Sequence, residues 1–146
     1  MRRTYKIFIS HAWDYDDDYY GVENLLQGSS LDWMNLSVPS HDKIHDARNR
    51  VELLSALERE IRSSDCVLIV SGMYCNHRFW IQREIAIAQH QEKPIIGIYL
   101  RGQLRAPRAV RAAAWEMVGW NTNSIVSAIR GWCRAKRNPV RIEFER

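Results

Sequence analysis

The stretch Asp65–Leu100 decides the fold: it reads DCVLIVSG, a short loop, HRFWIQREIAIAQHQ and finally KPIIGIYL. Val67–Val70 is an unbroken apolar run of strand length, which is typical of a strand buried on both faces of a parallel sheet. Ile95–Leu100 has the same character. Between them, apolar residues recur with the spacing of one helical face at Ile81, Ile85 and Ala88. The stretch therefore predicts two parallel strands joined by a right-handed helical crossover.

The rest of the chain continues the alternation of strands and helices. We expect five strands, near residues 5–10, 32–38, 65–71, 94–100 and 116–120. This alternation predicts a parallel sheet with helices on both faces. Five strands fit an α/β, flavodoxin-like, three-layer αβα fold with strand order 2-1-3-4-5. Ligands in such sheets bind beyond the carboxyl ends of the strands at the switch point, here between the first and third strands.

Length and composition indicate one soluble domain over residues 1–146, which are enough to enclose a core. Hydrophobic residues make up 46% and charged residues 26%, as in ordinary globular proteins. No segment has the apolar length of a membrane helix or the pattern of a signal peptide, so we expect a cytoplasmic protein without a membrane partner. The three cysteines lack a CxxC spacing and are expected to be reduced thiols.

The net charge of +4 is unevenly distributed. Residues 1–100 carry 11 Lys/Arg and 14 Asp/Glu, hence −3, whereas residues 101–146 carry 10 and 3, hence +7. A basic tail over 134–146 suits an acidic partner or nucleic acid on charge alone. We expect a solvated helix end and tail instead, because the basic residues are not interleaved with aromatic ones as in single-strand binders. Two other segments are polar or arginine-rich: Ser40–Arg48 predicts a loop, and Gly102–Ala114 a loop or a short irregular helix.

The sequence lacks the residue patterns that several common reactions and metal sites require. No glycine-rich phosphate loop follows a strand, which disfavours hydride transfer with a dinucleotide and P-loop reactions. A receiver-type phosphoacceptor would need an acidic residue where the third predicted strand ends in Ser71. His41 and His45 have the spacing of a zinc-binding pair, but no third ligand is evident, so we expect exposed histidines and no metal site.

Trp80 and Glu84 lie four residues apart on the helix that begins at the expected site, so they share a face. This pair suits cleavage of a glycosidic bond to a cationic base. Nicotinamide leaves as a neutral molecule without a general acid, and a carboxylate offsets the oxocarbenium charge that develops on the ribose. An indole can stack on the nicotinamide ring. Two plainer interpretations stay open: a surface ion pair of Glu84 with Arg83 or Lys93, and Trp80 as a half-buried packing residue.

Several segments together resemble a TIR (Toll/interleukin receptor) domain, most closely the stand-alone bacterial TIR-like proteins of the Thoeris ThsB type. They are Ile7–His11, Ser63–Ser71, Trp80–Ile85, Lys93–Ile98 and Val118–Ile125. The resemblance covers about residues 5–133, and its most specific part is the WxxxE pattern. The chain departs from many TIR domains in having Ile81 after the tryptophan instead of a cysteine. The arginine-rich segment over 101–111 is not a general TIR feature either.

The resemblance implies that Glu84 is the catalytic residue of NAD⁺ cleavage and that Trp80 binds the substrate beside it. It also implies that the loop of Ser10 and His11 borders the substrate. The predicted switch point adds Trp13 and Ser71 to the same cleft. NAD⁺ is then a substrate, and no cofactor is expected.

For the product and the partners, the resemblance implies an ADP-ribose-derived signal, most simply a cyclic one, made in bacterial antiphage defence. A separate effector protein would receive that signal. Self-association would use the Ser40–Arg48 loop. Two other functions remain: a non-catalytic TIR scaffold, since a fold does not fix a function, and a nucleoside deoxyribosyltransferase-like enzyme, which also acts at a glycosidic carbon.

Overall fold

The computed structural model describes residues 3–10, 17–37, 47–71, 78–99 and 101–137, and side chains throughout these ranges except at 47–50 and 134–137. Within them, strands and helices alternate as the sequence predicts. The elements are β1 (Tyr5–Ile9), α1 (Asp17–Gln27), β2 (Trp33–Asn35), α2 (Ala47–Ser63), β3 (Cys66–Val70), α4 (Arg78–His90), β4 (Ile95–Ile98), α5 (Arg108–Ala113), β5 (Glu116–Val118) and α6 (Thr122–Arg137).

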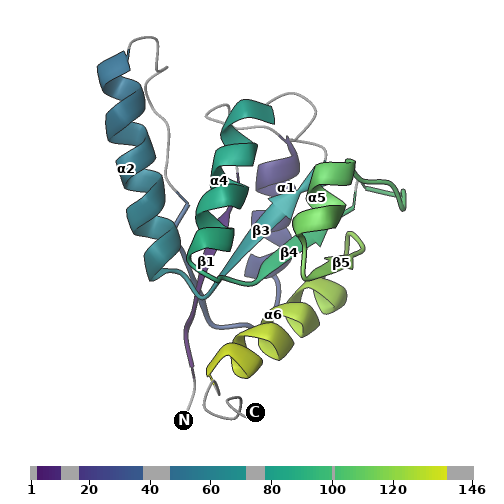
Figure 1. Ribbon diagram of the computed structural model, residues 1–146. Helices are drawn as coiled ribbons and strands as arrows, with labels where there is room; N and C mark the ends of the chain where they lie inside the picture. Colours follow the sequence, from purple (N-terminus) through teal and green to yellow (C-terminus); the bar gives the residue numbers. More distant parts are fainter. Residues whose placement is uncertain (1–2, 11–16, 38–46, 72–77, 100, 138–146) are drawn as a thin grey trace, which may run out of the picture.

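All five strands form one parallel sheet in the order β2-β1-β3-β4-β5, which confirms the predicted topology. In the centre, Phe8 of β1 lies opposite Val67 of β3, and Leu68 of β3 lies opposite Ile96 of β4. Figure 1 shows α2, α4 and α5 in front of the sheet and α1 behind it. Helix α6 packs against α1 and against β4 and β5. The result is the expected flavodoxin-like, three-layer fold.

Strands β3 and β4 are buried along their whole length, as their unbroken apolar runs predict. They hold the centre of the sheet, where helices cover both faces. Helices α2 and α4 pack side by side on one of these faces (Figure 1). Each contributes one buried stripe to the core: Leu53, Leu57 and Ile61 from α2, and Ile81, Ile85 and Ala88 from α4.

Strand β2 is shorter than the predicted 32–38. Beyond Asn35, individual hydrogen bonds of Leu36 and Ser37 with β1 replace the regular strand pairing. The Leu36 N–H still donates to the Ile7 carbonyl at 2.8 Å. At the next step a side chain replaces the backbone: the Ser37 hydroxyl accepts from the Ile9 N–H at 2.9 Å and donates to the Ile9 carbonyl at 3.0 Å. Ser37 thereby fixes the end of β1 next to Ser10.

Two other boundaries differ from the sequence expectations, and for a third segment the structure decides between two predicted alternatives. The last two residues of the predicted Ser40–Arg48 loop form the start of α2, and residues 38–46 lie outside the described residues. Helix α6 extends to Arg137, so the first four residues of the predicted 134–146 tail are helical. Within Gly102–Ala114 the short-helix alternative holds over Arg108–Ala113, because Pro107 precedes the helix with a fixed φ of −57°.

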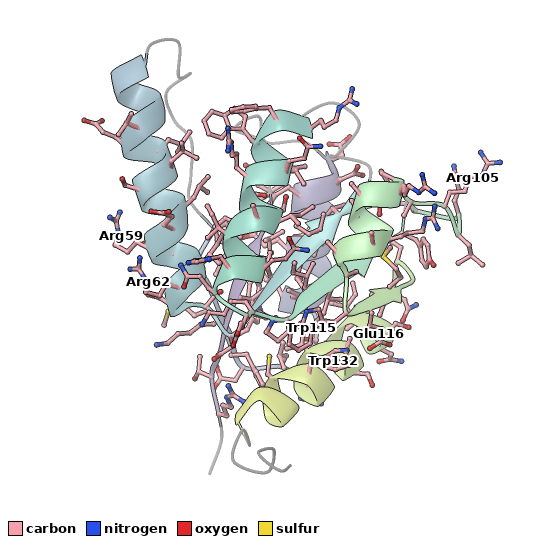
Figure 2. All side chains as sticks on the ribbon, viewed as in Figure 1. Arg59, Arg62, Arg105, Trp115, Glu116 and Trp132 are labelled. Atoms are coloured by element: carbon pink, nitrogen blue, oxygen red, sulfur yellow. The ribbon has the colours of Figure 1, made fainter. Side chains whose placement is uncertain are left out.

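Tryptophans tie α6 to the sheet edge. The Trp132 indole N–H donates to a Glu116 carboxylate oxygen at 2.8 Å, and its ring meets Trp115 edge-to-face at 5.3 Å (Figure 2). Cys66 and Cys133 are free and buried, and hydrogen bonding to Cys133, together with burial, raises the pKa of the Cys66 thiol. Among the described residues, no helix combines the length and apolarity needed to span a membrane.

Helix α1 approaches Trp120, shortly after β5, very closely at Gly21. A Cβ atom added there would lie 2.6 Å from Cζ2 of Trp120 and 3.2 Å from a guanidinium nitrogen of Arg101. The Arg101 guanidinium is stacked 4.8 Å from the centroid of the Trp120 ring. The indole therefore has little freedom to yield, and only glycine allows α1 to approach it this closely.

We expect Gly21→Ala to lower the free energy of unfolding by about 1–3 kcal/mol, because overpacking against Trp120 outweighs the better helix propensity of alanine. Gly131→Ala in α6 is the matched control. An added Cβ there meets nothing within 4 Å, so stability should rise by up to about 1 kcal/mol. Urea unfolding of the two variants measures this difference. Equal stabilisation by both substitutions would contradict the packing argument.

Candidate functional site

Two serines mark the carboxyl ends of the central strands. Ser10 directly follows β1, and its N–H donates to the carbonyl of Leu68 in β3 at 2.8 Å. Ser71 directly follows β3. Both side chains are fully buried. Because β1 and β3 are parallel neighbours, the two hydroxyls lie at the same edge of the sheet, at the predicted switch point.

Glu84 occupies a core position of α4. Its spacing from Ile81, Ile85 and Ala88 is that of a single helical stripe, and this stripe faces the sheet. The Glu84 side chain is accordingly only 1% exposed. The sequence-based alternative of a surface ion pair with Arg83 or Lys93 is therefore wrong, because the apolar stripe turns the carboxyl inward.

The polar atoms of this cluster lack partners. Among the described residues, neither carboxyl oxygen of Glu84 nor the hydroxyl oxygens of Ser10 and Ser71 have a hydrogen-bond partner. Buried polar groups are nearly always paired, and each unpaired one costs about 1–3 kcal/mol. Within the described part of the chain no hydrogen bond satisfies these three side chains, which makes them candidates for contact with a ligand.

Burial raises the pKa of the Glu84 carboxyl from its ordinary value of 4.5 to about 8, since a charge there is cut off from water. The Ser10 hydroxyl acts in the opposite direction and lowers this pKa, which places it beside the carboxyl even though no hydrogen bond of full geometry joins them. In the unliganded protein at neutral pH, Glu84 is therefore mostly a neutral acid. A cation brought next to it would favour the carboxylate.

Trp80 lies one turn before Glu84, is half-buried and packs against the core, as the plainer interpretation has it. Its ring meets Phe79 edge-to-face, with 5.0 Å between centroids. The Arg83 guanidinium lies 5.0 Å from the Phe79 centroid. Phe79 is 51% exposed, so α4 presents an aromatic and cationic surface next to Trp80. Sequence analysis missed this surface, although the i,i+4 spacing of Phe79 and Arg83 is a readable signal.

Of the predicted site residues, the fold brings Ser10 and Glu84 together and places Ser71 at the same sheet edge. Trp80 shares α4 with Glu84. His11 and Trp13 lie outside the described residues, as do His41 and His45. Within the described part of the chain, no three histidine, cysteine or acidic side chains gather as metal ligands would.

Comparison with known protein families finds a matching family model. The family model described as Thoeris protein ThsB, TIR-like domain, matches residues 8–105, which is more than half of the chain and runs from the last two residues of β1 past β4. The match includes Ser10, Ser71, Trp80 and Glu84. A search of curated proteins finds no match. Since the match covers the switch-point edge of the sheet together with α4, the chain belongs to the ThsB family of TIR-like domains and is a Thoeris-type defence protein.

Proposed function

We propose that this protein cleaves NAD⁺ at the bond between nicotinamide and ribose, and that it releases an ADP-ribose-derived signal, in its favoured form a cyclic one. The observation that carries the proposal is the Glu84 carboxyl, buried and without a hydrogen-bond partner among the described residues, beside Ser10 at the switch point. Membership of the ThsB family supports a role in defence, with a separate component receiving the signal.

The chemistry follows from the charges. As the glycosidic bond breaks, its electron pair moves to the pyridinium nitrogen, and nicotinamide leaves as a neutral molecule. Positive charge then develops on the ribose, where an ionised Glu84 stabilises it in a site with little water. Attack by water, with loss of a proton to solvent, gives ADP-ribose, whereas attack by a nitrogen of the same molecule's adenine forms a new glycosidic bond and gives a cyclic product. The unpaired hydroxyls of Ser10 and Ser71 are suited to bind ribose hydroxyls.

Binding of NAD⁺ would itself ionise the carboxyl. The positive pyridinium lowers the pKa of a neighbouring acid, so the substrate converts the resting neutral form of Glu84 into the carboxylate that the reaction needs. Trp80 would contact the nicotinamide ring, and the adjacent Arg83 would face the negative diphosphate. Because the Glu84 side chain is 1% exposed, the atoms that cover it must move to admit the substrate.

Two other functions make different demands. A non-catalytic TIR scaffold has no use for the buried Glu84 carboxyl, whose oxygens have no hydrogen-bond partner among the described residues. Such a carboxyl only lowers the stability of the fold. A nucleoside deoxyribosyltransferase-like enzyme would use the same carboxylate but act on neutral nucleosides. Nicotinamide release from NAD⁺, measured alongside base release from a nucleoside, separates the three functions.

Glu84→Gln keeps the shape of the side chain and removes its charge. We expect NAD⁺ turnover to fall by roughly 10²-fold or more, because the charge that opposes the oxocarbenium is lost. Nicotinamide release followed by chromatography measures the change. Glu58→Gln, an exposed carboxylate on α2, is the matched control and should leave turnover unchanged. Turnover of the Glu84 variant within a few-fold of the parent would reject the assignment.

The raised pKa of Glu84 also predicts a pH-dependent stability. The folded-state pKa of about 8 lies above the ordinary 4.5, so the folded protein binds more protons between these values, and its stability falls as pH rises through this window. Glu84→Gln lacks this loss. We expect the variant to gain about 1 kcal/mol per pH unit relative to the parent between pH 5 and 8. Chemical unfolding at three pH values measures it, and a constant difference would show that the carboxyl is not shielded.

We infer that a second copy completes the NAD⁺ site through the Ser40–Arg48 loop, most of which lies outside the described residues. The negative residues 1–100 and positive residues 101–146 would attract head to tail, a contact that salt screens. Specific activity should then rise with protein concentration and fall at high salt. Turnover per molecule that stays constant from nanomolar to high micromolar protein would exclude assembly-dependent catalysis.

A further inference from the structure

A groove of about 620 Å³ lies between the segment that directly follows α1 and the first ten residues of α6. Its lining comprises Gly28, Ser29, Ser30, Thr122, Asn123, Val126, Ser127, Arg130 and Gly131. None of the candidate site residues is among them. The volume falls within the range of about 300–1,000 Å³ that small-molecule sites occupy.

Hydrogen bonds fix the walls of this groove. The Thr122 hydroxyl donates to the Leu25 carbonyl at 3.0 Å and joins the start of α6 to the last turn of α1. The Ser29 hydroxyl donates to the Leu26 carbonyl at 2.6 Å and accepts from the Leu31 N–H at 3.1 Å, which fixes the chain as it leaves α1. The groove is thus part of the folded framework.

Arg130 supplies the only charge in the lining, which includes no acidic side chain. It is half-buried, and its one hydrogen bond among the described residues is a long contact of 3.4 Å to the Ser30 hydroxyl. No carboxylate of the described residues forms a salt bridge with it. A half-buried guanidinium that no described carboxylate pairs with favours an anion, and its planar fork of donors matches the oxygens of a phosphate.

The other polar groups extend the site beyond one anion. The side chains of Asn123 and Ser127 have no hydrogen-bond partner within the described part of the chain. Together with Ser30 they offer donors and acceptors of the kind that bind sugar hydroxyls. Gly131 leaves this wall bare, because an added Cβ there would meet nothing within 4 Å.

We propose that this groove is a second ligand site, which binds a small phosphorylated sugar with its phosphate on Arg130 and its hydroxyls on Ser30, Asn123 and Ser127. The ligand is an anionic phosphomonoester with several hydroxyl groups. The groove shares no residue with the Glu84 cluster, so ligand binding here can be tested separately from NAD⁺ cleavage.

The test is titration of the full chain with ribose 5-phosphate, inorganic phosphate and ribose, followed by amide NMR. We expect saturable 1:1 binding of ribose 5-phosphate that shifts the backbone amides of Ser30, Ser127 and Gly131. Inorganic phosphate should bind at least tenfold more weakly, and ribose should not saturate. Equal affinity for phosphate and ribose 5-phosphate, or no saturation by about 20 mM ligand, would overturn the proposal.

Variants localise the site. Arg130→Gln should weaken binding of ribose 5-phosphate by about 10–100-fold, since it removes a charged hydrogen-bond donor. Gly131→Phe should block the groove, because Gly131 lines it and a Cβ added there meets nothing within 4 Å. Arg62→Gln is the matched control, because this arginine is exposed on α2, away from α6 (Figure 2), and it should bind as the parent does. Unchanged binding in both groove variants, with their thermal unfolding intact, would exclude this site.

Discussion

The parallel pairing of β1 with β3 brings together the buried polar side chains of the candidate site, Ser10, Ser71 and Glu84. Ile9 lies opposite Leu68, so the two strands end at the same edge, with Ser10 after one and Ser71 after the other. Helix α4 follows β3 and begins at that edge, as a right-handed crossover requires. Glu84 is therefore carried back over the sheet to lie beside Ser10. Without this pairing, the same residues would be distributed around the molecule.

The burial of Glu84 opposes the stability that this packing provides. A pKa near 8 in place of 4.5 means that ionising the carboxyl inside the protein costs several kcal/mol, on the order of 1.4 kcal/mol for each pKa unit. Leucine at position 84 would continue the apolar stripe of α4 and avoid that cost. Stability therefore does not account for a carboxyl at this position, which is why we propose a role for it toward a cationic ligand. Stability lost at a functional site in this way is common in enzymes.

The sequence predicts most of the architecture because its strongest signals are local. The apolar runs of β3 and β4 have the length and composition of doubly buried strands, and the alternation with helices predicts the parallel sheet, whose five strands fit the observed order. The end of β2 could not be predicted, because the Ser37 side chain takes over from the backbone there. Helix α2 also begins two residues earlier than the end of the predicted loop, because Ala47 and Arg48 are compatible with either a loop or a helix.

For the candidate site, the sequence identifies Glu84 by its spacing from Trp80 and by the switch point. Its depth of burial was missed, although Glu84 falls on the same stripe as Ile81, Ile85 and Ala88. The absence of partners for its oxygens is different in kind. It depends on which groups the tertiary fold brings near, and no local pattern along the chain reports that. The same limit applies to Arg130, which in the sequence is only one of ten basic residues over 101–146.

Glu84 and Arg130 are ionisable side chains of opposite charge type in the same physical situation. Each is an ionisable side chain removed from full solvent, and neither has a counter-charge among the described residues. A protein stabilises such groups most simply by pairing them, and this chain has enough charges of both signs to do so. The fold instead holds them on different surfaces, one under α4 and one between α1 and α6. That separation suits ligands that supply the missing charges: a cationic ring at Glu84 and a phosphate at Arg130.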